Sequence, residues 1–153
     1  MRYDATVAAD RRRRVIVPIP FEPDDVWGPK AVHHVAGTVN GMRVRAVVEP
    51  VGDGHGMVLG AAWRRDCGIA PGDEVAVVLV PEGPQRADLP PDVATALDAE
   101  PAAGAFFDSL AQFYRHAYLR WIDATKRSPD KRAARIAEMV DLLKAGTKER
   151  PRR

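Results

Sequence analysis

Residues 37–81 read GTVNGMRVRAVVEPVGDGHGMVLGAAWRRDCGIAPGDEVAVVLVP, and this stretch decides the fold. Asn40-Gly41 supplies two residues that tolerate positive φ between β-branched neighbours, which predicts a β-hairpin with a type I′ turn. After the turn, apolar residues alternate with Arg43 and Arg45. This period of two is typical of a half-buried strand, so both arginines are predicted to point away from the core.

The second half of the stretch predicts two turns, one short helix and one strand. Three glycines in residues 52–56 predict a sharp corner. Residues 59–67 are long enough for two helical turns, which Gly68 would end. Pro71-Gly72 predicts the next turn, and residues 75–80 are apolar on both faces, as in an interior strand. These elements predict an antiparallel β domain.

Upstream of this stretch, residues 3–8, 14–19 and 31–39 are predicted strands. The run Arg11–Arg14 is interpreted as a solvated turn and strand edge, although four adjacent cations could also bind phosphate. His33 and His34 are adjacent, so a regular strand points them to opposite faces and they cannot chelate one metal ion together.

Downstream, the chain changes from strand patterns to helical ones. Residues 92–99 predict a short helix, and residues 103–126 carry apolar side chains at steps of three and four, which predicts one longer helix. A last helix is predicted to begin after Ser128, a candidate N-cap, with Pro129 at its first position, and to end at Gly146. We expect the two longer helices to form an antiparallel hairpin. Residues 86–89 are predicted to form a last short strand, and residues 148–153 a loose tail.

Composition and charge exclude several classes of protein. The chain has 153 residues and 46% hydrophobic residues, enough for a real core and unlike a disordered chain. A single cysteine excludes a disulfide framework. No apolar run approaches the roughly 20 residues that span a bilayer, and the N-terminus lacks the apolar region of a secretory signal, so we expect a cytoplasmic protein. Residues 106–153 hold 12 Lys and Arg against 6 Asp and Glu, which places positive charge in the C-terminal third.

The motifs resemble two families. V-x-G-T-V-N-G, G-D-G-H and G-I-A-P-G-D-E-V resemble a bacterial family of domains of unknown function, for which the resemblance implies a small double-split β-barrel of AbrB/MazE-like architecture. The C-terminal segment resembles the YdeI/OmpD-associated, or bacteriocin-protection, family. The residues that carry this second resemblance are Phe107, Leu110, Tyr118–Ile122, Lys126, Arg127, Arg132, Arg135, Ile136, Leu142, Leu143 and Gly146. Neither family has an established activity, so the resemblance implies a fold.

No catalytic constellation stands out in the sequence. Ser109 lies inside a predicted helix, Ser128 is explained as a cap, and neither belongs to a G-x-S-x-G motif. Cys67 follows two arginines but has no partner motif, so we interpret it as an inert thiol. The histidines show no ligand spacing, and we expect no metal site and no cofactor. An enzyme is the weakest hypothesis, and we predict no catalytic residues.

The strongest candidate site is a cluster of cations around the turn between the last two helices, which we call the basic elbow. Its members are Arg120, Lys126, Arg127, Lys131, Arg132 and Arg135. The N-terminus of the last helix would add N–H donors for an anion. The alternative is that these side chains only complement the helix dipole and contact solvent. Arg43 and Arg45 form a second, weaker basic candidate.

We therefore predict a mainly β protein with α-helices: a small double-split, AbrB-like β-barrel in residues 1–89, a helical segment in residues 90–147 and a tail in residues 148–153. The first functional hypothesis is a non-catalytic binding module, related to stress or bacteriocin protection by the name of its family, that binds an anionic ligand or protein partner through the basic elbow. The second is a DNA-binding regulator, by analogy with AbrB-type barrels. Either hypothesis requires elbow cations that face water and are not neutralised by carboxylates.

Overall fold

A computed structural model describes residues 1–151 of the chain. The protein forms two compact units, Met1–Pro81 and Glu82–Arg153, each with its own hydrophobic core. Residues 82–89, which the sequence analysis assigned to the β domain, thus belong with the helices. The short strand predicted at residues 86–89 is wrong, because Arg86–Asp88 is a 3-10 turn whose Arg86 pairs with Asp98 and Asp108 of the helical unit.

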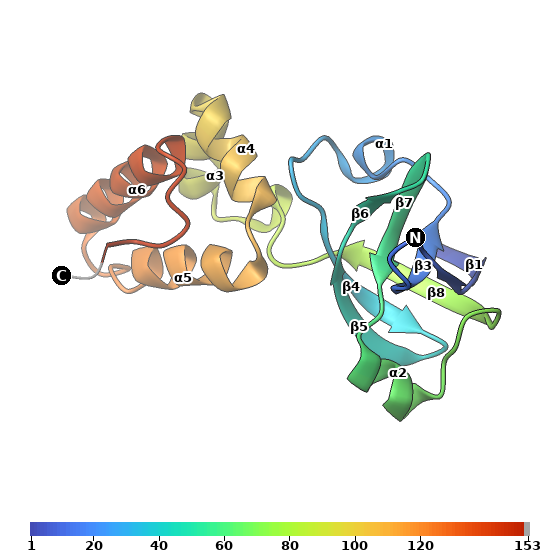
Figure 1. The fold of residues 1–153 in the computed structure, drawn as a ribbon. Coiled ribbons are helices and arrows are strands. Elements are labelled where there is room, and N and C mark those ends of the chain that lie inside the picture. The colour runs from blue at the N-terminus through green and yellow to red at the C-terminus, as the bar shows by residue number, and fades with distance from the viewer. Residues whose placement is uncertain (152–153) are drawn as a thin grey trace. The chain divides into compact units, whose positions relative to one another are not determined.

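The first unit consists of two four-stranded antiparallel sheets (Figure 1). One sheet has the strand order β1 (Arg2–Thr6), β8 (Glu74–Pro81), β4 (His34–Val39), β5 (Met42–Val47). The other has the order β2 (Ala8–Ala9), β3 (Val15–Ile19), β7 (Gly54–Val58), β6 (Glu49–Val51). The mainly β fold with added helices is confirmed.

The two sheets do not close into one barrel, so this part of the prediction is wrong. The chain passes from one sheet to the other at Val7, which splits the single strand predicted at residues 3–8. The Val7 N–H donates to the Asp73 carbonyl at 2.8 Å, and the Gly72 N–H donates to the Val7 carbonyl at 2.7 Å. Because Val7 bonds to this turn, β1 and β2 pair with different strands.

The predicted hairpin is confirmed. Asn40 and Gly41 have φ values of 50° and 79°, and β4 pairs with β5 from Val39↔Met42 outward. Within β4, Gly37 lies directly against β8, where a Cβ atom would stand 1.7 Å from the Val78 carbonyl oxygen. The strand before the turn therefore requires glycine at this position.

The glycine-rich corner is smaller than predicted. Gly52, with φ of 56°, and Asp53 form the turn, whereas Gly54 to Gly56 already belong to β7. Gly56 lies between Pro18 of β3 and Glu49 of β6, and a Cβ there would meet the Val17 carbonyl oxygen at 3.2 Å. The glycine pattern thus reflects close packing of strands in addition to a change of direction.

Two short helices complete the first unit, α1 (Pro23–Trp27) and α2 (Ala61–Cys67). Gly68 ends α2 in the left-handed conformation, as predicted. Trp27 packs against the core and makes an edge contact with Phe21. The predicted interior strand is confirmed as β8, but its outward face is less covered than expected, since Val80 is 51% exposed.

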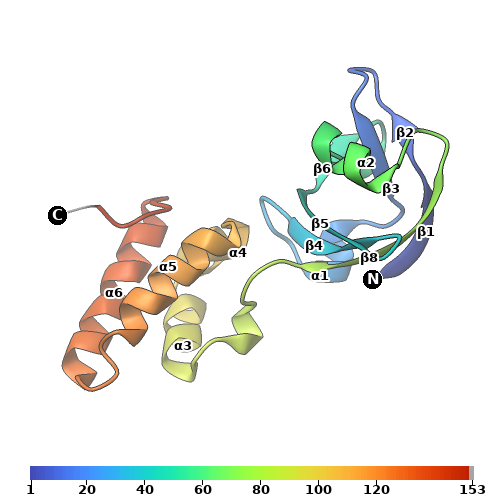
Figure 2. The same cartoon turned by 90° about the horizontal axis from the view of Figure 1, so that it is seen from below.

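The second unit contains α3 (Pro91–Ala99), α4 (Pro101–Ser109), α5 (Gln112–Asp123) and α6 (Pro129–Lys144). Helix α6 contacts each of the other three, and α5 and α6 run antiparallel as a hairpin (Figures 1 and 2). The core side chains of this unit include Leu97, Phe107, Ile122, Met139 and Leu143.

The single helix predicted for residues 103–126 is wrong, because the chain leaves the helical conformation at Leu110 and Ala111. The side chain of Arg115, only 2% exposed, stabilises this break. It donates to the carbonyls of Leu110, Pro84 and Asp108 at 2.9, 3.0 and 2.6 Å. One guanidinium group thus satisfies the Asp108 and Leu110 carbonyls, which a continuous helix would have paired internally, and also bonds to Pro84.

The end of α6 fits the prediction, but the tail after it differs. Gly146, with φ of 75°, ends the helix, and Ser128 occupies the N-cap position without a side-chain capping bond. The Tyr118 hydroxyl donates to the Thr147 carbonyl at 2.8 Å. Arg150 lies over the Trp121 ring with its Cζ 4.2 Å from the centroid, so Thr147 and Arg150 both contact the helices. Residues 152 and 153 of the predicted loose tail lie outside the described residues.

Candidate anion-binding site

The turn between α5 and α6 is built by local hydrogen bonds. The Thr125 hydroxyl donates to the Ile122 carbonyl at 2.6 Å, and the Ser128 N–H donates to the Thr125 carbonyl at 2.9 Å. Thr125 is buried, so this bond compensates for the loss of water at its hydroxyl. The turn places Lys126 and Arg127 on its exposed side, next to the first turn of α6.

Arg132 does not face water freely, because two carboxylates hold it. Its Nε and Nη2 donate to the two carboxylate oxygens of Asp92 at 2.6 and 3.0 Å, and its Nη1 donates to Asp123 at 3.1 Å. Hydrogen bonding to Arg132 lowers the pKa of Asp92, and the same bonds raise the pKa of Arg132. Arg132 therefore joins α3, α5 and α6, and its charge is neutralised inside the unit.

Four other members of the basic elbow are exposed: Arg120, Lys126, Arg127 and Lys131. Within the described part of the chain, none of their side chains forms a hydrogen bond or an ion pair. Asp130 lies in the first turn of α6 and already supplies a negative charge near the helix N-terminus. The exposed side chains, and not the helix end, are therefore the main source of positive potential here.

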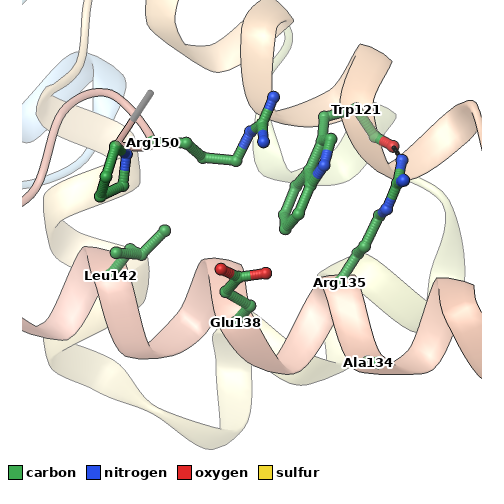
Figure 3. Close-up of a pocket in the computed structure, with 7 residues that line it drawn as sticks. Trp121, Ala134, Arg135, Glu138, Leu142 and Arg150 are labelled. Carbon is green, nitrogen blue, oxygen red and sulfur yellow. Dashed lines mark hydrogen bonds between the residues drawn. The ribbon is translucent and has the colours of Figure 1, made fainter. Parts of the chain in front are cut away.

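The sixth member, Arg135, contacts Trp121. Its Nη1 donates to the Trp121 carbonyl at 2.6 Å, and its Cζ lies 5.1 Å from the centroid of the indole ring. Arg150 approaches the same ring from the C-terminal segment. Figure 3 shows the indole between these two guanidinium groups.

A pocket of about 420 Å³ opens beside this arrangement (Figure 3). Glu138 and Leu142 of α6 point into the same space, and Ala134 and Pro151 complete the lining. Ala134, Glu138 and Leu142 follow one another at steps of four, so they share one face of the helix. The pocket thus combines two guanidinium groups, one carboxylate and several apolar surfaces.

The second basic candidate lies in the β unit. Arg43 and Arg45 are exposed on β5, as predicted, and both line a groove of about 720 Å³ that Leu59, Gly60 and Trp63 also border. The Trp63 indole N–H donates to the Arg43 carbonyl at 2.7 Å, which fixes α2 beside this strand. Arg45 already has an interaction within the chain, so it contributes less free charge to the groove.

Two of the other polar candidates, His33 and Arg14, have structural partners. His33 is buried and lies 2.6 Å from the Asp24 carboxylate, and this hydrogen bond is the largest cause that lowers the pKa of Asp24. In the Arg11–Arg14 run, Arg14 pairs with Asp10 at 2.8 Å and Glu49 at 3.0 Å. Among residues 1–151, no three His, Cys, Asp or Glu side chains gather as metal ligands would, and no helix is long and apolar enough to span a membrane.

Three residues with notable contacts in the helical unit were not predicted from the sequence: Arg115, Glu138 and Arg150. The spacing of Arg135, Glu138 and Leu142 was a signal, because steps of three and four place them on one helix face. Arg150 could have been found from Gly146, since a C′ glycine in the left-handed region turns the chain back along the helix. For Arg115 the sequence offers no such signal, because its three acceptors are backbone carbonyls of other segments.

Comparison with known families covers both units. The family model described as "Domain of unknown function (DUF1905)" matches residues 3–79. The model described as "Bacteriocin-protection, YdeI or OmpD-Associated" matches residues 86–146. Both resemblances inferred from the motifs are thereby confirmed. A comparison with curated proteins finds no match.

Proposed function

We propose that this chain, which belongs to the DUF1905 family of domains of unknown function, is a binding module without catalytic activity. Its helical unit binds an anionic ligand or an acidic protein partner. The contact surface is the part of the basic elbow that remains unpaired, namely Arg120, Lys126, Arg127 and Lys131, with Arg135 beside it.

One observation carries this proposal: the elbow cations are sorted into two kinds. Arg132 is held by two carboxylates, whereas Lys126, Arg127 and Lys131 have no ion-pair partner among residues 1–151. Unpaired cations that are close in sequence and exposed on one turn create a local positive potential that attracts anions and speeds their association. Arg132 links α6 to α3 and α5 through its ion pairs, and so stabilises the helices that carry these side chains.

The experiment measures binding of two polyanions, poly-glutamate and DNA, by fluorescence anisotropy at increasing salt concentration. Poly-glutamate represents an acidic protein surface, and duplex and single-stranded DNA represent a polyphosphate. We expect the protein to bind poly-glutamate at low salt, with an affinity that falls as salt rises. Reversing Lys126, Arg127 and Lys131 to Glu should abolish this binding.

A matched control separates a local surface from overall charge. Reversing Arg11, Arg12 and Arg13 to Glu changes the net charge by the same amount, on exposed side chains of the other unit. This control should retain poly-glutamate binding. If both triple variants lose binding equally, or if neither polyanion binds the wild type at low salt, the proposal is wrong.

DNA is the alternative partner. The analogy to AbrB-type barrels supports it, and the formal net charge of +2 argues against tight non-specific binding. If the protein binds DNA tightly with a steep salt dependence and binds poly-glutamate weakly, its partner is a nucleic acid and not an acidic protein.

We also propose a cytoplasmic location. The single cysteine supports it, because a chain that cannot form an internal disulfide bond is typical of a reducing compartment. Fractionation of cells that produce the tagged protein tests this location, and recovery from the periplasm would contradict it.

A further inference from the structure

We infer that the pocket beside Trp121 is a binding site for a carboxylate attached to an apolar group. This inference does not rest on the proposed function: the pocket shares Arg135 with the proposed contact surface, but its other guanidinium group, Arg150, lies outside the basic elbow. The inference rests on the charges of the pocket, the contacts of its guanidinium groups with Trp121 and the chemistry of its remaining walls.

The guanidinium groups are held in place before any ligand arrives. Arg150 and Arg135 lie 4.2 and 5.1 Å from the centroid of the Trp121 ring, within the range of a cation–π contact. A guanidinium that stacks on a ring keeps its N–H donors in its own plane, where they can bind a carboxylate with two parallel hydrogen bonds. Holding the side chain in advance reduces the entropy lost on binding.

These donors are also available. Arg150 forms no hydrogen bond or ion pair within residues 1–151, and only Nη1 of Arg135 is used, by the Trp121 carbonyl. By contrast, the N–H donors of Arg132, which lies on α6 with Arg135, are bonded to Asp92 and Asp123. The helix thus presents one arginine that serves structure and one that faces the pocket.

The charge and the walls of the pocket favour a carboxylate over a phosphate. Two guanidinium groups line it beside Glu138, which already has an interaction within the chain, so the donors available to an anion come from the arginines. The further oxygens of a phosphate dianion would lose water without finding other donors among the apolar walls. A carboxylate has two acceptor oxygens in one plane, which matches one guanidinium fork.

The remaining walls favour an apolar group next to that carboxylate. Ala134, Leu142 and Pro151 line the pocket together with Trp121. A volume of about 420 Å³ lies within the range of small-ligand pockets, about 300–1,000 Å³. An aromatic or branched aliphatic carboxylate would fill it, whereas acetate would leave the apolar walls uncovered.

The experiment follows the indole N–H signals of the full-length chain by two-dimensional ¹H–¹⁵N NMR. The chain has three tryptophans, so replacing Trp27, Trp63 and Trp121 by Phe one at a time assigns the three signals. Benzoate, acetate and inorganic phosphate are titrated at constant ionic strength. We expect benzoate to shift the Trp121 signal to saturation, and acetate and phosphate to bind at least about tenfold more weakly.

Two variants test the role of the arginine. Arg150→Gln should weaken benzoate binding about tenfold, as expected for losing a charged hydrogen bond. Lys148→Gln removes the same charge two residues away in the exposed part of the segment and should leave binding unchanged. The spectrum of each variant shows directly whether the helical unit remains folded.

The outcomes separate this inference from the proposed function. The variant with Lys126, Arg127 and Lys131 reversed should still bind benzoate, because none of these residues lines the pocket. A Trp121 signal that does not respond to benzoate would overturn the inference. So would phosphate binding as tight as benzoate binding, or an Arg150→Gln variant that binds benzoate like the wild type.

Discussion

Arg115 shows how one buried residue can determine where a helix stops. Its guanidinium group donates to three carbonyls and packs over Phe107, with Cζ 5.5 Å from the ring centroid. Burial lowers its pKa, while the charges of Asp108 and Glu82 act in the opposite direction. The cost of burying this charge is compensated by bonds that no shorter side chain can make.

We therefore predict that Arg115→Met destabilises the helical unit by about 3 kcal/mol, since three acceptors each lose a bond worth about 1 kcal/mol. Arg115→Lys should recover less than half of this, because one ammonium group cannot reach all three carbonyls. Urea unfolding followed by helical circular dichroism measures both. Arg120→Met, an exposed change on the same helix, is the control and should stay within about 0.5 kcal/mol of the wild type.

Asp92 gives a prediction on pH. Its pKa is lowered, chiefly by the hydrogen bonds from Arg132, so the pairing stabilises the folded state above the pKa of the unfolded chain. This contribution is lost as the pH falls through the lower, folded pKa. A carboxyl titration by NMR should give Asp92 a pKa below the usual range near 4, and Arg132→Gln should return it to that range. An unchanged Asp92 titration in the variant would contradict the assignment.

At the level of elements, local chemistry could be predicted and long-range pairing could not. The Asn40-Gly41 turn, the Gly68 stop and the Pro129 start of α6 each depend on conformational preferences of one or two residues. The break between α4 and α5 depends on bonds from Arg115 to carbonyls in two segments, the end of α4 and Pro84, and it leaves the apolar periodicity of residues 103–126 intact. A periodic pattern therefore predicted the buried face correctly and the continuity of the helix wrongly.

In the sheets, too, local patterns could be predicted and long-range contacts could not. Alternation predicted most of the strands, but the chain passes between the sheets at Val7 because of its bonds to the turn at Gly72 and Asp73. Similarly, the sequence identified the elbow cations but not which of them is paired, because Asp92 lies on a helix far away in the chain.

Arg132 is predicted to act as the tie between three helices. Arg132→Gln removes its ion pairs with Asp92 and Asp123, which are both partly exposed, so the expected loss of stability is about 1 kcal/mol. Lys131→Gln changes the same charge at the neighbouring position without a partner and should have no measurable effect. Urea unfolding of both variants at neutral pH shows whether Arg132 stabilises the helical unit or acts only as an exposed cation. Equal effects would mean that Arg132 contributes no more than an exposed cation.

On the scale of the whole molecule, charge and packing are distributed differently. Formal charge is concentrated in residues 106–153, which carry 12 Lys and Arg against 6 Asp and Glu. Buried hydrophobic side chains occur in both units, and each unit has a contiguous core made of its own residues. A change from period two to steps of three and four is visible without any structure, and on this basis the sequence predicts a β part and a helical part.

Because each unit has its own core, we predict that a defect in one unit leaves the other unit folded. A substitution at Gly37 tests this prediction. Gly37→Ala would place a Cβ 1.7 Å from the Val78 carbonyl, so β4 and β8 must separate, at a cost of about 3 kcal/mol. Gly54→Ala is the matched control in another strand, where the nearest atom would lie 4.0 Å away, and it should not destabilise the unit. Hydrogen exchange measured peptide by peptide should show faster exchange throughout residues 1–81 of Gly37→Ala, with residues 91–144 exchanging as in the wild type. Faster exchange of both units together would show that they unfold as one cooperative structure, and the independence inferred from their cores would be wrong.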